Sequence, residues 1–381
     1  MPLSASTKPL HYLSPGEFDR ERAQIFSRMW IFAGMANEIP NPNDYLRARI
    51  AGREIIVQNG SGTIRAFLNS CSHRHSHIHE APCGNRKLIC PYHGWSYNDE
   101  GIPTGIPAKE NFPQVCANPA QFALQQFEVA LAGHFIFVRL IPGGPDLKIH
   151  LGHAHEFLVN ASTGLHRNMD EFQGTITANW KVVIENALEG YHVGMVHRTT
   201  LGAIKQLSVR KQDVVDHLPA DSGHSYMINR ANEEWLKKWR RYERALGLWP
   251  FKFDHYVHQL IFPNLTVTSF MGYSFHIQCF QPDAVGKTTV HSRIYSVNCK
   301  EQTAKGESIM RTVYEEGKRF TRKVFSEDQH ACELTYLGIH DAEKSAVLAE
   351  DLEKRIAHFQ KAYLLSMERQ SETPDTSVSR T

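Results

Sequence analysis

Residues 71–95 read CSHRHSHIHEAPCGNRKLICPYHGW, and this stretch decides how the rest of the chain is interpreted. It holds two short Cys/His pairs, Cys71 with His73 and Cys90 with His93, with sixteen residues between them. Each pair can occupy one loop and face the other. Such a set suits either a structural zinc ion or a [2Fe–2S] cluster in which one iron takes both cysteines and the other takes both histidines. Zinc sites more often draw two cysteines from one loop, so this division favours the cluster.

Three further histidines lie between the two Cys/His pairs and could also be considered as metal ligands. His75, His77 and His79 alternate with other residue types. This alternation predicts an exposed extended segment, which leaves them outside the ligand set.

A second group of histidines lies in residues 179–197, NWKVVIENALEGYHVGMVH. His192 and His197 are five residues apart, which separates them by about 140° on a regular helix. Both reach one metal ion only if the helix ends or bends between them, and Gly194 is placed to allow that. Glu189 precedes His192 by three residues, so its carboxylate can orient that imidazole. A 2-His-1-carboxylate site for non-haem iron still needs one carboxylate from elsewhere, and Asp328 is the candidate.

Composition narrows the class of protein. The chain has 381 residues, enough for two domains, and 42 Lys+Arg against 40 Asp+Glu give a net charge of +2. Neither nucleic acid nor an anionic membrane is favoured as a partner. His134 and Arg139 interrupt the longest apolar run, at residues 129–141, and the N-terminus lacks the pattern of a secretory leader. We therefore expect a soluble, cytoplasmic protein without a disulfide framework.

Short strands and turns fill residues 30–140, a Pro/Gly break follows at residues 142–148, and helices and strands alternate after it. The fold class predicted is α+β, an all-β domain followed by an antiparallel sheet with helices. The expected strands are 45–50, 54–58, 63–69, 88–90, 132–140, 264–271, 273–281 and 290–298. The expected helices are 185–193, 235–249 and 343–369, and the polar tail 370–381 is expected to be disordered.

Three motifs resemble those of one family. The run C-x-H with C-P-Y-H-G-W resembles the signature of Rieske proteins, and NALEGYHVGMVH and FSEDQHACE resemble the two-histidine and carboxylate motifs of Rieske non-haem iron oxygenases. The closing segment EKRIAHFQKAY is similar as well. The family includes aromatic-ring-hydroxylating and quaternary-ammonium oxygenases, and the resemblance indicates their alpha (terminal oxygenase) subunit.

The resemblance implies a set of iron ligands. Cys71 and Cys90 would bind the inner iron of the cluster, His73 and His93 the outer iron, and Trp95 would pack over them. His192, His197 and Asp328 would bind a mononuclear Fe(II), with Glu327 as the fallback carboxylate. One departure is His75, which stands where the family usually has glycine.

The resemblance also implies an organisation. Residues 1–29 would be a helical segment on the catalytic domain, 30–141 the Rieske domain and 142–369 a helix-grip catalytic domain. A head-to-tail homotrimer would place Glu189 between His93 of one subunit and His192 of the next. A reductase or ferredoxin, docking in one interpretation on the basic segment 236–244, would supply electrons. Oxygen from O2 would enter a small organic substrate, either aromatic or an N-methylated acid or amine, by mono- or dioxygenation.

Two other classes compete with this one. A pure Rieske electron carrier needs only the cluster domain, and the ~240 residues after the Pro/Gly break count against it. A zinc-stabilised binding module would be colourless. Taken singly, the second-site histidines could be buried helix residues and Asp328 a helix N-cap, but their occurrence together with the cluster motif favours two iron sites.

Overall fold

The computed structural model describes residues 7–203, 214–220, 222–234, 236–237, 240, 255–270, 272, 274–297 and 304–368. The chain divides into two compact units. The first unit is Phe26–Thr163, and the second unit combines Met1–Ile25 with Gly164–Thr381. Residues 142–163 thus lie with the first unit. No helix among the described residues has both the length and the apolar character needed to cross a membrane.

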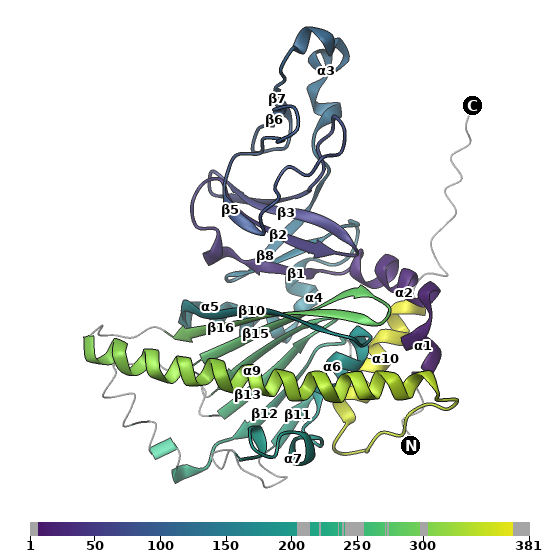
Figure 1. Ribbon diagram of the computed structural model, residues 1–381, viewed down its shortest axis with the longest axis vertical. Coiled ribbons are helices and arrows are strands. Elements are labelled where there is room, and N and C mark those ends of the chain that lie inside the picture. The colour runs from purple at the N-terminus through teal and green to yellow at the C-terminus, as the bar shows by residue number, and fades with distance from the viewer. Residues whose placement is uncertain are drawn as a thin grey trace. The chain divides into compact units, whose positions relative to one another are not determined.

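The first unit is built on antiparallel strands (Figure 1). A seven-stranded sheet has the order β1-β9-β8-β4-β3-β2-β5, and β6 pairs with β7 beyond it. The strands are β1 Ile31–Met35, β2 Asp44–Ile50, β3 Arg53–Gly60, β4 Thr63–Leu68, β5 Cys83–Asn85, β6 Ser96–Tyr97, β7 Pro103–Gly105, β8 Gln126–Ala132 and β9 Phe135–Arg139. The short helices are α3 Pro113–Ala117, α4 Leu147–Leu151 and α5 His153–Gly164.

The centre of this sheet is apolar on both faces. Ile55, Ile56 and Val57 are fully buried in β3, where β-branched side chains pack well against neighbouring strands. The predicted strands 45–50, 54–58 and 63–69 are confirmed by β2, β3 and β4. The strand predicted at 88–90 is wrong, since only Ile89 makes an isolated bridge, to Ser96. The strand predicted at 132–140 is split by a turn at Gly133, whose φ is +61°.

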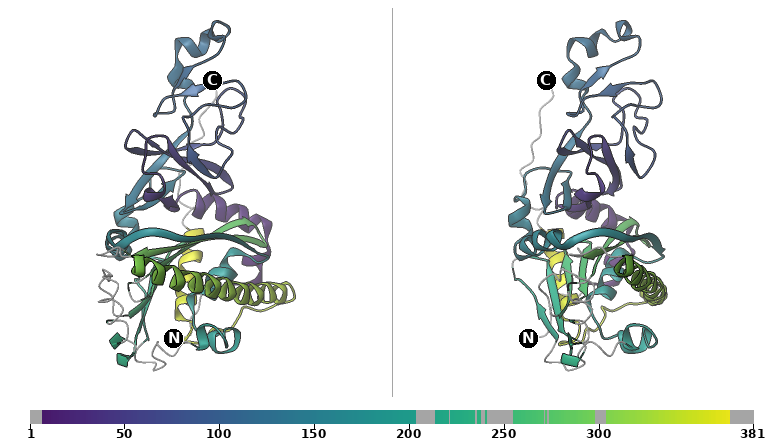
Figure 2. Two further views of the ribbon diagram at one scale, coloured as in Figure 1. Left: turned by 60° about the vertical axis from the view of Figure 1, so that its left-hand side comes forward. Right: turned by 90° about the vertical axis from the view of Figure 1, so that its left-hand side faces the viewer.

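The second unit is a seven-stranded antiparallel sheet with helices on it (Figure 2). Its order is β10-β16-β15-β14-β13-β12-β11. The strands are β10 Leu165–Ile176, β11 Val214–His217, β12 Ser225–Arg230, β13 His255–Ile261, β14 Leu265–Phe270, β15 Ser274–Ala284 and β16 Lys287–Val297. β14, β15 and β16 confirm three predicted strands. Together the two units confirm the predicted α+β class.

Helix α9, Ala304–His340, lies across this sheet (Figure 1). It is seated on β10: the rings of Phe325 and Phe172 meet edge to face at 5.3 Å, and Arg322 donates two hydrogen bonds of 2.9 Å to Asp170. The sequence analysis did not predict this helix, in which polar residues outnumber apolar ones. Helix α10, Lys354–Glu368, begins later than the predicted start at 343; Val347, expected on its buried stripe, is 95% exposed.

Two short N-terminal helices, α1 Pro9–Leu13 and α2 Pro15–Glu21, precede the first unit in sequence, and a buried ion pair joins α2 to α6, Trp180–Leu188. Glu21 and Lys181 are both fully buried. Trp180 and Tyr363 donate to the same carboxylate at 2.7 and 2.9 Å, so the buried charge is well partnered. The helix predicted at 235–249 and the basic segment 236–244 lie largely outside the described residues.

Candidate metal centres

Two loops with the same backbone pattern carry the Cys/His pairs of the first unit. The amide of Cys71 donates to Ser76 O at 2.9 Å, and that of Cys90 donates to Trp95 O at 2.8 Å. Four residues after each cysteine, the amides of His75 and Gly94 donate back to the cysteine carbonyl, at 2.8 and 3.0 Å. His75 and Gly94 also share a left-handed conformation, with φ of +63° and +74°. His75 therefore adopts the conformation for which glycine is usual.

The four ligand candidates lie as two pairs. The Cys71 and Cys90 thiols are near neighbours and almost fully buried, while the His73 and His93 rings are 4.7 Å apart between centroids. Within the described part of the chain, no three of these four present ligand atoms mutually within 4.8 Å. One tetrahedral zinc ion would need closer convergence, whereas a two-iron cluster separates the cysteine pair from the histidine pair.

Local polar groups also fit a cluster. Nδ1 of His73 is buried without a hydrogen-bond partner, which suits a nitrogen that binds metal. Burial lowers the pKa of His73, so the ring is neutral, the form that coordinates. The Tyr97 hydroxyl lies 3.0 Å from Cys71 Sγ, and the Trp95 ring stacks on His73 at 5.1 Å. Tyr97 was not singled out from the sequence, although it ends the same CPYHGWSY run.

The interior histidines differ from the sequence expectation at one position. His75 and His77 are exposed as predicted. His79 is fully buried, stacked on Tyr45 at 3.8 Å between centroids, with Nε2 3.3 Å from Gln58 Oε1. Alternation alone did not reveal that this end of the segment enters the core.

In the second unit, the chain bends between Glu189 and His192 rather than at Gly194. α6 ends at Leu188, and the one-turn helix α7, Val193–Val196, follows. His192 is the N-cap of α7 and His197 its C-cap, so the two histidines flank a single turn and Gly194 lies inside it. This short helix is what turns both imidazoles toward one point.

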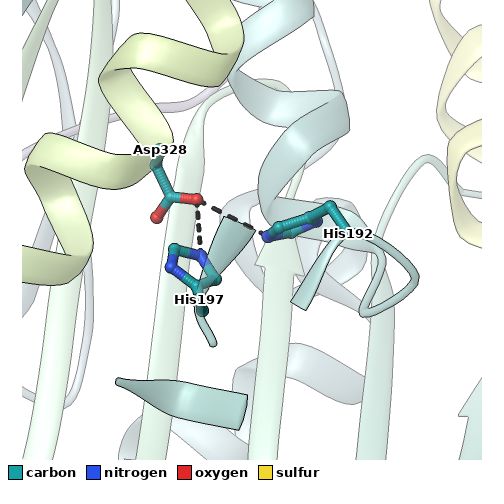
Figure 3. A group of neighbouring side chains, drawn as sticks. All are labelled: His192, His197 and Asp328. Carbon is teal, nitrogen blue, oxygen red and sulfur yellow. Dashed lines mark hydrogen bonds and ion pairs between the residues drawn. The ribbon is translucent and has the colours of Figure 1, made fainter. Parts of the chain in front are cut away.

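His192, His197 and Asp328 converge, and their ligand atoms all lie within 4.8 Å of one another (Figure 3). Asp328 Oδ1 is 2.9 Å from His197 Nε2 and 3.5 Å from His192 Nε2. Asp328 comes from the middle of α9, not from a helix N-cap. The Asn186 side chain, from α6, donates to the same Oδ1 at 2.9 Å, a contact that the sequence did not indicate.

A glutamate contacts the Nδ1 atom of each histidine. Glu189 Oε1 lies 2.5 Å from His192 Nδ1, and Glu327 Oε2 lies 2.7 Å from His197 Nδ1. The Thr200 hydroxyl donates to Glu327 Oε2 at 2.6 Å. Glu327, the fallback ligand, therefore faces the side of His197 away from Asp328. Nothing in the sequence marks Thr200 or predicts the contact of Glu327 with His197. Glu327 stands out in the sequence only because it is adjacent to Asp328.

The charges around these side chains suit a cation. Burial lowers the pKa of His192, but hydrogen bonds with Asp328 and Glu189 outweigh it and raise the pKa to about 9. Burial raises the pKa of Asp328, yet hydrogen bonds from both histidines and Asn186 bring it down to about 2. Asp328 thus stays ionised and draws positive charge to the nitrogens, where a divalent metal ion would replace the protons.

Comparisons with known proteins agree with both centres. The model of the Rieske [2Fe-2S] domain matches residues 29–128, and the model of the ring hydroxylating alpha subunit, catalytic domain, matches residues 153–369. The anthranilate 1,2-dioxygenase large subunit of Acinetobacter baylyi is 32% identical over 221 residues, 54% of this chain and 46% of that protein. The glycine betaine monooxygenase oxygenase subunit of Chromohalobacter salexigens is 33% identical over 233 residues, 59% of this chain and 49% of that protein.

The fold has a close match among solved structures. The quaternary ammonium Rieske monooxygenase CntA in complex with L-carnitine superposes with a TM-score of 0.76 at 19% identity, covering 95% of this chain and 96% of that chain. The matches to the curated relatives span about half of those proteins' length.

The chain thus combines two kinds of iron centre. The β domain carries the loops for a two-iron cluster, and the sheet-and-helix domain carries two histidines and a carboxylate for a single iron. The chain belongs to the family of ring-hydroxylating alpha subunits and carries the family's Rieske domain. Its cofactors are a Rieske [2Fe–2S] cluster and a mononuclear iron.

Proposed function

We propose that this chain is the terminal oxygenase component of a Rieske oxygenase, which inserts oxygen from O2 into a small organic substrate. The observation that supports this most is the convergence of His192, His197 and Asp328 in a chain that also has the cluster loops. The iron would supply redox chemistry with O2 at the coordination positions that three protein ligands leave open. The surrounding residues orient the ligands and keep Asp328 ionised.

We further propose Cys71, Cys90, His73 and His93 as the cluster ligands and His192, His197 and Asp328 as the ligands of the mononuclear iron. The paired geometry of the first set and the convergence of the second support the assignment. The first set would carry electrons that a reductase or ferredoxin supplies, and the second would use them.

A head-to-tail homotrimer is proposed to join the two centres. His93 is exposed, and beside it Tyr92 is 56% exposed. Around His192, Tyr191 is 66% exposed and Met195 69%. Exposed aromatic and Met side chains at both positions are typical of a surface that a partner covers. Glu189 already accepts from His192 in its own subunit and would accept from His93 of the neighbour.

The substrate is proposed to be an aromatic or N-methylated acid or amine, since one similar relative is named for anthranilate and another for glycine betaine. A cytoplasmic location is proposed with it, because reduced nicotinamide is supplied there and the exposed Cys83 and Cys116 are free thiols.

A single-turnover experiment tests this function without the natural reductase. The iron-loaded protein is reduced by dithionite, freed of excess reductant and exposed to ¹⁸O₂ with benzoate, anthranilate, glycine betaine or carnitine. The proposal predicts an ¹⁸O-labelled product from at least one of these or their close analogues, and none from Asp328→Ala. Reoxidation of the cluster without oxygenated product from any member of a wide panel would indicate an electron carrier instead.

A further inference from the structure

The carboxylate of Glu327 lies against His197 on the side of the ring opposite Asp328. We propose that Glu327 is a positioning residue, which holds His197 in the tautomer and orientation that binds the mononuclear iron. This inference rests on the proposed function of the site and adds a residue to it.

Each of the two ring nitrogens of His197 has a carboxylate partner in this arrangement. Nδ1 lies 2.7 Å from Glu327 Oε2, and Nε2 lies 2.9 Å from Asp328 Oδ1. The ring itself is fully buried. A neutral imidazole has one ring proton, and it must sit on Nδ1 if Nε2 is to give its lone pair to iron. Glu327 is the acceptor for that proton, and without it a buried N–H would have lost its partner.

Helix geometry explains why two adjacent carboxylates do different work. Successive residues of α9 are rotated by about 100°, so Glu327 and Asp328 cannot approach the same point from the same direction. Their side chains instead reach the two nitrogens of one ring. Glu327 therefore does not compete with Asp328 for the iron.

Thr200 holds the carboxylate in place. Its hydroxyl donates to Glu327 Oε2 at 2.6 Å, and its side chain is almost fully buried. The turn after His197 brings it there, because the amides of Thr200 and Gly202 both donate to the His197 carbonyl, at 3.0 and 2.9 Å. The turn thus links ligand, threonine and glutamate.

The two glutamates of the site are then distinguishable. Glu189 lies in the loop between α6 and α7 and is proposed to be shared with a neighbouring subunit. Glu327 belongs to a long helix and contacts only groups of its own site among the hydrogen bonds described. Its loss should weaken iron binding without altering the cluster.

The test measures iron binding directly. Fe(II) affinity is determined by competition with a chromophoric chelator in the holoprotein, with the visible spectrum of the cluster as the measure of folded protein. The EPR spectrum of the nitric oxide adduct of the Fe(II) site reports ligand geometry. The variants are Glu327→Ala, Glu327→Gln and Thr200→Val. The matched control is Glu333→Gln on the same helix, whose carboxylate accepts from the Thr177 amide at 3.0 Å instead of from a histidine.

We expect Glu327→Ala to weaken Fe(II) binding by about 10- to 100-fold and to change the EPR signal. Glu327→Gln, which keeps an acceptor oxygen, should recover most of the affinity, and Thr200→Val should lose less than Glu327→Ala. Glu333→Gln should behave as wild type. Wild-type affinity and an unchanged EPR signal in Glu327→Ala would overturn the inference. If that variant does not fold, wild-type affinity and an unchanged EPR signal in Thr200→Val would do so. A wild-type protein that binds no Fe(II) would refute the proposed function itself.

Discussion

Among single residues, His75 shows how a departure from a family pattern can be accommodated. Its left-handed φ of +63° matches that of Gly94 at the equivalent position of the other cluster loop. A non-glycine residue there costs about 1 kcal/mol or slightly more. Its side chain is exposed, and a 3.4 Å contact between Nδ1 and Ser70 Oγ offsets little of that cost.

His75→Gly should therefore stabilise the cluster loop. We expect the temperature at which the visible band bleaches to rise by a few degrees, and His75→Val to lower it. The control is His77→Gly, because His77 is also exposed but has no left-handed φ. A gain from His77→Gly as large as that from His75→Gly would contradict the explanation.

His79 makes the first unit sensitive to acid. Burial lowers its pKa to about 4, with nearby Arg86 and Arg47 adding to the effect. The unfolded state, with a pKa near 6.5, then takes up a proton more readily than the folded state. Stability is thus complete above pH 6.5 and is lost as pH falls toward 4, by roughly 2 kcal/mol at pH 5.

His79→Phe keeps an aromatic ring on Tyr45 but removes the titration. We expect the variant to show a smaller loss of cluster melting temperature between pH 7 and pH 5 than wild type. Equal losses would show that other groups control acid stability. The comparison uses each protein's own value at pH 7 as its reference, so a uniform change in stability does not affect it.

At the scale of elements, α9 is the largest difference between expectation and structure. The motif FSEDQHACE identified Asp328, yet the helix that carries it was missed because polar residues outnumber apolar ones along its length. The strands of the first unit could be predicted from the turn residues between them. The one-turn helix α7 could not be predicted from the sequence. Its caps are the two histidines themselves, which have no capping propensity to mark them.

The fit of α9 on β10 should control the iron site. A Cβ added at Gly174 would overlap the Phe325 ring, three residues before Asp328. Gly174→Ala should shift the helix and weaken Fe(II) binding by about tenfold or more, while the cluster spectrum is retained. Gly317→Ala, on α9 with open space around the new Cβ, should leave iron binding unchanged and stabilise the helix by about 1 kcal/mol. Measuring the Fe(II) affinity of both variants tests whether the fit of α9 on β10 controls the iron site.

At the scale of the whole molecule, the sequence could indicate candidate ligands for each iron centre but not how the centres communicate. Motif spacing pairs ligands within a loop; the distance between loops of different subunits leaves no trace in one sequence. The substrate is equally hidden, because its contacts come from scattered side chains rather than from a motif. Complementation between damaged subunits addresses the assembly.

Cys71→Ser should lose the cluster and Asp328→Ala the mononuclear iron, so neither should turn over alone. If electrons pass between subunits, co-expressed variants form mixed oligomers in which an intact cluster faces an intact iron site, and a fraction of the activity returns. No recovery in mixed oligomers verified by differential tags would place both centres of a working pair in one subunit.

The proposed function depends most on the presence of two iron centres in one chain. Anaerobic analysis of the purified protein for metal and acid-labile sulfide, with spectra before and after dithionite, measures this directly. We predict about three irons and about two sulfides per chain, with a visible band that bleaches on reduction. Zinc in place of iron, with no labile sulfide, would contradict it.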